Sequence, residues 1–148
     1  MILVDSSVWV DFFNDFNSPE KKELEKYLED GEIVYTTGII AAEILAGIKK
    51  EDTFLEVKEI LSQLHHLSPT FEDYVKTAEL YRHLRSKGFT IRNIIDCLIA
   101  EMVAENGLML LQKDRDFKNI KRFYPSLQLV EIYTADTQIK EIDQSEKG

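Results

Sequence analysis

Short runs of apolar, largely β-branched residues alternate along this chain with amphipathic stretches of helical length, and this alternation restricts the fold more than any other feature. Such runs are too short for helices and are typical of buried strands. We predict strands at 2–4, 33–35, 108–111 and 127–133, and a very short one within the segment HHLSPT, ended by Pro69. Strands separated by helices pair in parallel, with helices on both faces. The predicted fold class is therefore α/β, a three-layer α/β/α sandwich with a central parallel sheet.

The helices are predicted from apolar periodicity and from residues that begin or end helices. Ser6 or Ser7 is expected to cap a first helix, and Ser18 followed by Pro19 opens a second. Thr36 or Thr37 caps the next helix. Further helices are expected over 54–64, over 70–84, which opens with the capping box TFED, and from about 91 to 105.

Length and composition favour a single globular domain. The chain has 148 residues, of which 44% are hydrophobic, enough for a substantial core. We expect residues 1–133 to form one domain and the polar segment 134–148 to be a C-terminal extension. No apolar run approaches the roughly 18 residues of a membrane span, and Cys97 is the only cysteine, so we expect a cytoplasmic protein with no membrane partner. Cys97 itself is expected in the core.

The charge is unfavourable for binding nucleic acid when it is averaged over the chain. Eighteen Lys and Arg residues face 27 Asp and Glu residues, and the net charge is −9. The distribution is uneven, because residues 82–122 contain nine basic and five acidic side chains, a local balance of +4. Solvated helix faces would explain such scattered basic residues equally simply.

Carboxylates stand where the predicted sheet would bring them together. Asp5 follows the first strand directly, and Asp114 and Asp116 follow the strand through Leu111. In a parallel sheet these positions share the edge where ligands bind. Glu43 and Asp96 each interrupt the apolar pattern of a helix, so we expect both carboxylates to point inward, where burial is costly.

Each acid also has a purely structural explanation. Asp5 or Asp116 could do no more than cap a helix, and Asp96 could pair with Arg92 four residues earlier. Four or five carboxylates at one edge would nevertheless repel one another unless a multivalent cation lay among them. Oxygen ligands without Cys or nearby His favour Mg²⁺ or Mn²⁺.

Proteins with an acidic metal site at the edge of a parallel sheet carry out few kinds of reaction, and this sequence does not fit two of these protein classes. A receiver domain needs an acid at the end of the third strand, where HHLSPT has none. A phosphatase with an aspartate nucleophile needs a second aspartate at position 7, which is Ser7. Metal-assisted hydrolysis of a phosphodiester remains.

Four segments in this order resemble the PIN-domain family, and most closely its VapC-type ribonuclease toxins: ILVDSSVWVDFF, TTGIIAAEILAG, IIDCLIAEMVAENG and LLQKDRDF. The resemblance implies metal-dependent endonucleolytic cleavage of RNA, with tRNA as one candidate substrate. It also implies a homodimer and a cognate VapB-like antitoxin. The acidic residues of the family fall on Asp5, Glu43, Asp96 and Asp114, with Asp116 as a frequent fifth acid.

On this basis we expect Asp5, Asp96 and Asp114 to hold the metal, with Glu43 and Asp116 completing the shell or orienting the attacking water. The candidates for contact with the substrate are Ser7, Arg92, Lys113 and Arg115. The family usually has Thr or Ser where this chain has Gln112. The alternative function is a PIN-like module that binds RNA or a partner without cutting, favoured only by the net charge and by Gln112.

Overall fold

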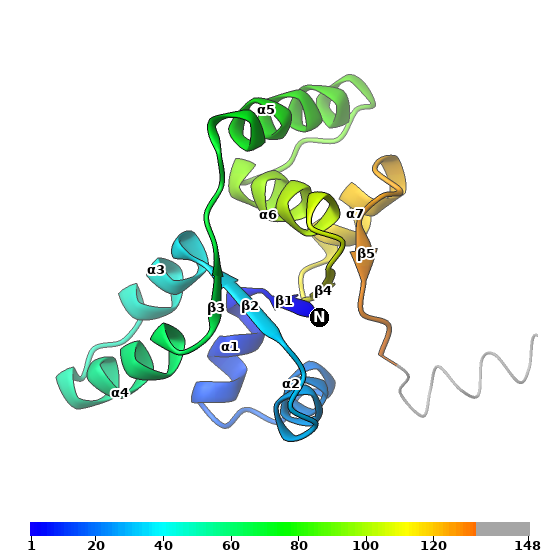
Figure 1. The fold of residues 1–148 in the computed structure, drawn as a ribbon. Coiled ribbons are helices and arrows are strands. Elements are labelled where there is room, and N and C mark those ends of the chain that lie inside the picture. The colour runs from blue at the N-terminus through cyan, green and yellow to red at the C-terminus, as the bar shows by residue number, and fades with distance from the viewer. Residues whose placement is uncertain (133–148) are drawn as a thin grey trace, which may run out of the picture.

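The computed structural model describes residues 1–132, and its centre is one five-stranded sheet (Figure 1). All pairings are parallel, with Leu3 opposite Tyr35 on one side and Leu110 on the other. The strands are β1 (Ile2–Val4), β2 (Val34–Thr37), β3 (His65–Leu67), β4 (Met109–Leu111) and β5 (Gln128–Leu129). The last strand is shorter than predicted, and the expected extension 134–148 lies outside the described residues.

The helices form two layers, with α1 to α4 on one side of the sheet and α5 to α7 on the other (Figure 1). They are α1 (Ser6–Phe13), α2 (Pro19–Glu29), α3 (Gly38–Ala46), α4 (Glu51–Ser62), α5 (Phe71–Ser86), α6 (Ile94–Glu105) and α7 (Arg115–Phe123). The predicted α/β/α sandwich is therefore confirmed. Among the helices of residues 1–132, none has the length and apolar character needed to cross a bilayer.

The strand order creates a crevice at one end of the sheet. The order is β3-β2-β1-β4-β5, so the chain adds strands on one side of β1 and then returns to add β4 and β5 on the other. Connections leave β1 and β4 toward opposite faces, which opens a space beyond their carboxyl ends. Asp5 and Asp114 follow these two strands.

Side chains and backbone conformation set where the helices begin, largely as predicted. The capping box of α5 is present, with Thr70 N donating to Asp73 Oδ2 at 2.7 Å and Asp73 N donating to Thr70 Oγ1 at 3.2 Å. The prediction for α1 was wrong, because its N-cap is Asp5 and not a serine. The α6 helix also begins later than predicted, after the N-cap Asn93. Ile91 instead lies buried in the preceding loop.

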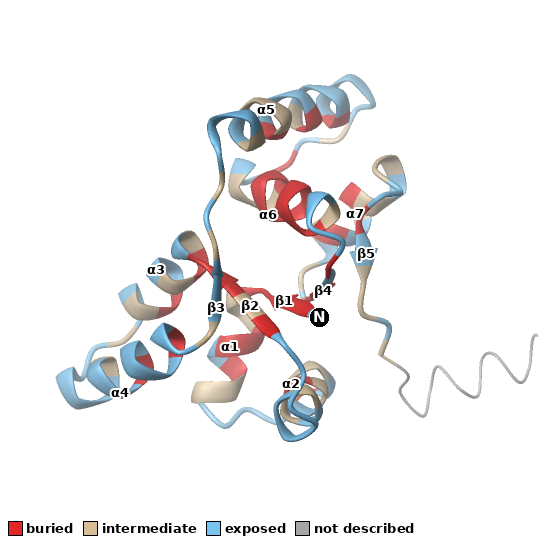
Figure 2. Ribbon diagram, in the orientation of Figure 1, coloured by how far each residue is buried: buried red, intermediate tan, exposed pale blue. Residues whose placement is uncertain are grey.

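The core lies between the sheet and both helix layers. All three residues of β1 are fully buried, as are Trp9 and Phe117 from opposite layers. Figure 2 shows burial concentrated on β1 and α6, whereas α4 and α5 carry wide exposed surfaces. Cys97 is buried in this core, as expected.

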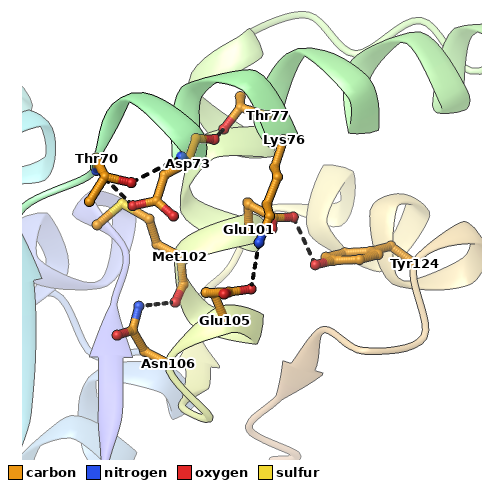
Figure 3. Close-up of polar contacts among 9 residues, drawn as sticks. All are labelled: Thr70, Asp73, Lys76, Thr77, Glu101, Met102, Glu105, Asn106 and Tyr124. Carbon is orange, nitrogen blue, oxygen red and sulfur yellow. Dashed lines mark hydrogen bonds and ion pairs between the residues drawn. The ribbon is translucent and has the colours of Figure 1, made fainter.

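A buried carboxylate that the sequence analysis missed ties α7 to α6 (Figure 3). Glu101 is only 5% exposed, and its Oε2 accepts a hydrogen bond of 2.8 Å from the Tyr124 hydroxyl. Burial, together with the bond to Glu101, raises the pKa of Tyr124, so this phenol stays protonated as a donor. On the neighbouring helix, Lys76 of α5 pairs with Glu105 at 3.3 Å. These contacts fix the helices whose first turns carry the site acids.

Candidate active site

An open cleft of about 620 Å³ lies beyond the carboxyl ends of β1 and β4. Four helices contribute side chains to the cleft. The helices α1, α6 and α7 do so near their N-terminal ends, and α3 does so through Glu43 in its middle. The lining residues are Asp5, Ser6, Ser7, Val10, Glu43, Arg92, Asn93, Asp96, Asp114 and Asp116. All five predicted acids therefore share one cleft.

Asp5 lies at the base of this cleft. It follows β1, caps α1 and is only 6% exposed. Its Oδ2 accepts a hydrogen bond of 2.7 Å from the Ser7 hydroxyl. Burial raises the pKa of Asp5 and Glu43 adds to this, while the hydrogen bonds from Ser7 act in the opposite direction. Asp5 is therefore both the N-cap of α1 and a residue of the cleft.

Three other carboxylates form a compact group. Oxygen atoms of Asp96, Asp114 and Asp116 all lie within 4.8 Å of one another. Asp96 belongs to the first turn of α6, and Asp114 is the N-cap of α7. Asp114 Oδ1 accepts from the backbone N–H of Asp116 at 3.0 Å, which fixes the two carboxylates relative to each other. Two helix N-termini therefore aim three acids at one point, where the helix dipoles favour negative charge.

Burial and nearby like charges together raise the pKa of Asp96. Burial is the largest cause, and the nearby Asp5, Asp114, Asp116 and Glu43 carboxylates add to it, raising the pKa of Asp96 from 3.8 to about 7. A carboxyl group with this pKa is partly protonated at neutral pH. A cation in the cleft would counteract the repulsion among these carboxylates and favour the ionised form of Asp96.

Arg92 supplies positive charge at the mouth of the cleft. Its Nε and Nη2 atoms both donate to Asp116 Oδ2 at 3.2 Å, and Nη2 lies 3.8 Å from Asp114 Oδ1. The pairing with Asp96 that helix spacing suggested is not the one observed. Arg92 precedes the N-cap of α6, so its side chain points to α7 rather than along α6. With 70% of this side chain exposed, Arg92 is also open to an incoming anion.

Glu43 and Asp96 are less buried than predicted. Glu43 is exposed, and its Oε2 accepts a hydrogen bond of 2.8 Å from the Ser6 hydroxyl. It stands at the edge of the apolar face of α3, beside the buried Ile44, and therefore reaches the open side of the cleft. Asp96 is half-buried because it lines the open cleft, whereas its neighbour Cys97 in the same turn of α6 is buried in the core.

The other predicted contacts divide into two groups. Ser7 and Arg92 line the cleft, whereas Lys113 and Arg115 do not. The Lys113 ammonium points away and donates to Asp11 Oδ2 at 2.6 Å. Arg115 is exposed on α7.

Gln112, the departure from the family pattern, lies outside the cleft lining. Its side-chain oxygen is buried and has no hydrogen-bond partner among the described residues. This oxygen therefore makes no polar contact to the cleft residues.

Two polar lining residues were missed at the sequence level. Ser6 holds Glu43, and Asn93 caps α6 through a 3.0 Å bond from the backbone N–H of Ile95. Asn93 could have been found, because Asn is a preferred N-cap residue and stands three residues before Asp96. Nothing in the local sequence identifies Ser6, since its partner lies 37 residues away.

The residues present fit a hard divalent cation. The donor set consists of carboxylate oxygens at the starts of α1, α6 and α7 and in the middle of α3, and the Arg92 guanidinium is the positive side chain in the lining. Carboxylates at this spacing suit Mg²⁺ or Mn²⁺, which prefer oxygen ligands. Sulfur and imidazole groups are not part of the lining.

Comparisons with known proteins agree with this geometry. The model of the PIN domain family matches residues 2–123. The chain is 33% identical over 124 residues to the VapC ribonuclease Mb1587 of Mycobacterium bovis and to the ribonuclease VapC11 of Mycobacterium tuberculosis, covering 82% of this chain and 92% of each relative. Among solved structures, VapBC2 from Rickettsia felis, bound to a DNA fragment from its promoter, aligns with a TM-score of 0.69 at 25% identity, covering 88% of this chain and 98% of that one.

Proposed function

This chain belongs to the PIN-domain family, and on that premise we propose that it is a metal-dependent endoribonuclease, the toxin of a VapBC-like toxin–antitoxin pair. The observation that carries the proposal is the meeting of Asp96, Asp114 and Asp116 at the switch point of the sheet, with Asp5 in the same cleft. Relatives named as ribonucleases support the reaction class.

Mg²⁺ or Mn²⁺ is the proposed cofactor, held by Asp5, Asp96, Asp114 and Asp116. When bound, such an ion supplies an activated water and stabilises charge on the phosphate and the leaving oxygen. Glu43 stands across the cleft, held by Ser6, and is placed to orient a water or accept its proton. Arg92 is exposed beside Asp116 and is positioned to contact the phosphate that enters the cleft.

In this proposal the buried Asp5 also links the start of α1 to the metal site. The Ser7 hydroxyl and backbone N–H both donate to one oxygen of Asp5, Oδ2. The other oxygen remains for a ligand, and its direction is fixed by these two bonds. Asp5 thereby couples the start of α1 to the geometry of the metal site.

The proposed protein partners are a VapB-like antitoxin and a second copy of this chain. A structure neighbour of this chain is a complex of the VapBC type, which supports an antitoxin. Phe71 and Tyr74 of α5 are 82% and 52% exposed and offer apolar area to a protein partner. Light scattering tests the homodimer, because the mass of a single chain at micromolar concentration would contradict it.

The function is tested by incubating the purified protein with total tRNA in Mg²⁺, Mn²⁺ or EDTA. Discrete fragments are expected with either metal, none with EDTA, and none from Asp96→Asn. A matched control is Asp52→Asn, which removes a carboxylate from the first turn of α4, away from the cleft. Cleavage by Asp96→Asn at the wild-type rate would contradict the proposed site.

The non-catalytic alternative is separated by metal binding. If the protein is the proposed endoribonuclease, it should bind Mn²⁺, and Asp5→Asn should abolish this binding. A protein that binds no Mn²⁺ and cuts neither tRNA nor other RNA would instead be the PIN-like binding module.

A further inference from the structure

The exposed face of α7 carries three basic side chains in line. Arg115, Lys118 and Arg122 have the spacing i, i+3 and i+7, which places them within one narrow sector of a helix. All three are exposed, whereas Phe117 and Ile120 on the opposite face are buried. We name Arg115, Lys118 and Arg122 the α7 stripe.

The stripe differs from the neighbouring basic side chains Lys113 and Lys121, which have polar partners. Lys121 of the same helix donates to the Leu127 carbonyl at 2.7 Å, and Lys113 binds Asp11. None of the ion pairs between side chains of residues 1–132 includes a member of the stripe. Exposed lysines without an ion pair also occur on α2 and α4, so the stripe is distinguished by the alignment of three cations on one helix face and by its position beside the cleft.

The stripe begins beside the cleft. Asp114 is the N-cap of α7 and Asp116 is in its first turn, so Arg115 stands between two of the clustered acids in sequence. The segment before α6 runs back along α7, since Phe89 packs on Phe123 at 4.7 Å while Arg92 reaches Asp116. Positive charge therefore continues from Arg92 at the mouth of the cleft along the whole outer face of α7.

Packing holds the far end of the stripe in place. The Arg122 guanidinium lies over the rings of Phe89 and Phe123, with its Cζ atom 5.8 and 5.6 Å from their centroids. Seven residues of helix span ~10 Å, the length of a few nucleotides of single-stranded RNA. Three unpaired cations at this spacing, one of them held by packing, match a chain of phosphates better than a single ion.

We propose that the α7 stripe binds the sugar–phosphate backbone of the RNA beside the cleaved bond. This inference rests on the proposed endoribonuclease function. The acidic domain repels RNA as a whole, and the stripe supplies the local attraction that brings one strand to the cleft. Because phosphates carry no base identity, the stripe contributes affinity and register, and base selection lies elsewhere.

The test is RNA binding measured without cleavage. Fluorescence anisotropy of end-labelled tRNA is recorded in EDTA over a range of NaCl concentrations, for the wild type and for Arg115→Gln/Lys118→Gln/Arg122→Gln. The stripe variant should bind at least about tenfold more weakly at low salt. Its plot of log affinity against log salt should be shallower by about 2, because each lost phosphate contact removes ~0.7 from the slope.

A matched triple variant tests whether weaker RNA binding comes from loss of the stripe or only from the change in net charge. Lys22→Gln/Lys26→Gln/Lys58→Gln removes the same charge from exposed positions on α2 and α4. Equal weakening by both triple variants, or wild-type binding by the stripe variant, would overturn the inference. Because Arg122 also packs on aromatic rings, the double variant Arg115→Gln/Lys118→Gln is measured alongside and should retain most of the loss.

Cleavage assays in Mn²⁺ keep this inference distinct from the proposed function. If the wild type cleaves RNA but the stripe variant binds RNA as tightly as the wild type, the stripe does not bind the RNA backbone. The proposed endoribonuclease function would be unaffected by that result. Stripe-dependent binding without cleavage would overturn the endoribonuclease and support the RNA contact. Unchanged RNA affinity with a weakened antitoxin complex would overturn the RNA assignment in favour of a protein interface.

Discussion

Replacing Asp96 by Asn should stabilise the metal-free protein while abolishing cleavage. A pKa of about 7 in place of 3.8 means that ionising this carboxyl group costs ~4 kcal/mol more in the folded protein than in the unfolded chain. Solvent at the open cleft screens part of this cost, and we expect a net gain of about 1–2 kcal/mol for Asp96→Asn at pH 8. The clustered acids would then be an example of stability given up for function.

The sign of the pH dependence follows from the raised pKa. The folded state of the wild type holds the Asp96 proton more tightly than the unfolded state does, so its stability falls as the pH rises from about 4 to about 7. Asn has no proton to lose. The advantage of Asp96→Asn should therefore be complete at pH 8 and smaller at pH 5.

Urea unfolding in EDTA at pH 5 and pH 8 measures this effect. Asp52→Asn is the matched control, since Asp52 is an exposed acid in the first turn of α4 and its loss should cost a few tenths of a kcal/mol at both pH values. Adding Mg²⁺ should stabilise the wild type far more than Asp96→Asn. If Asp96→Asn raises the free energy of unfolding equally at both pH values, or lowers it at pH 8, then ionised Asp96 does not destabilise the folded protein and the reasoning is wrong.

Three further outcomes are expected. The Mn²⁺ affinity measured by calorimetry should rise between pH 6 and pH 8, because the metal competes with the proton of Asp96, and a flat profile would contradict this. Tyr124→Phe should lower the free energy of unfolding by about 1–3 kcal/mol, because Glu101 loses its hydrogen-bond donor while buried, and should leave the rate of RNA cleavage per folded molecule unchanged. Arg92→Gln should change the free energy of unfolding by less than about 1 kcal/mol, because its pair with Asp116 is largely exposed, but should weaken RNA binding in EDTA.

The alternation of strands and helices was enough to predict the layers, the parallel sheet and the edge at which Asp5 and Asp114 meet. These features follow from local periodicity and from the rule that parallel strands need crossovers. The oxygen-only donor set was also visible, because residue type alone decides it. Start positions of helices were less certain, as Asp5 and Asn93 show, since several capping residues stood next to one another.

Only the tertiary structure decided how the acids share the cleft. Sequence spacing paired Arg92 with Asp96, but the turn before α6 sends this guanidinium to Asp116. Glu43 was expected inside and lies at the open rim, held by Ser6 from a distant part of the chain. Glu101, missed in the sequence, is buried because Tyr124 reaches it from another helix. Local patterns fix which face of an element is apolar, whereas the direction, burial and partner of a polar side chain depend on which other elements pack beside it.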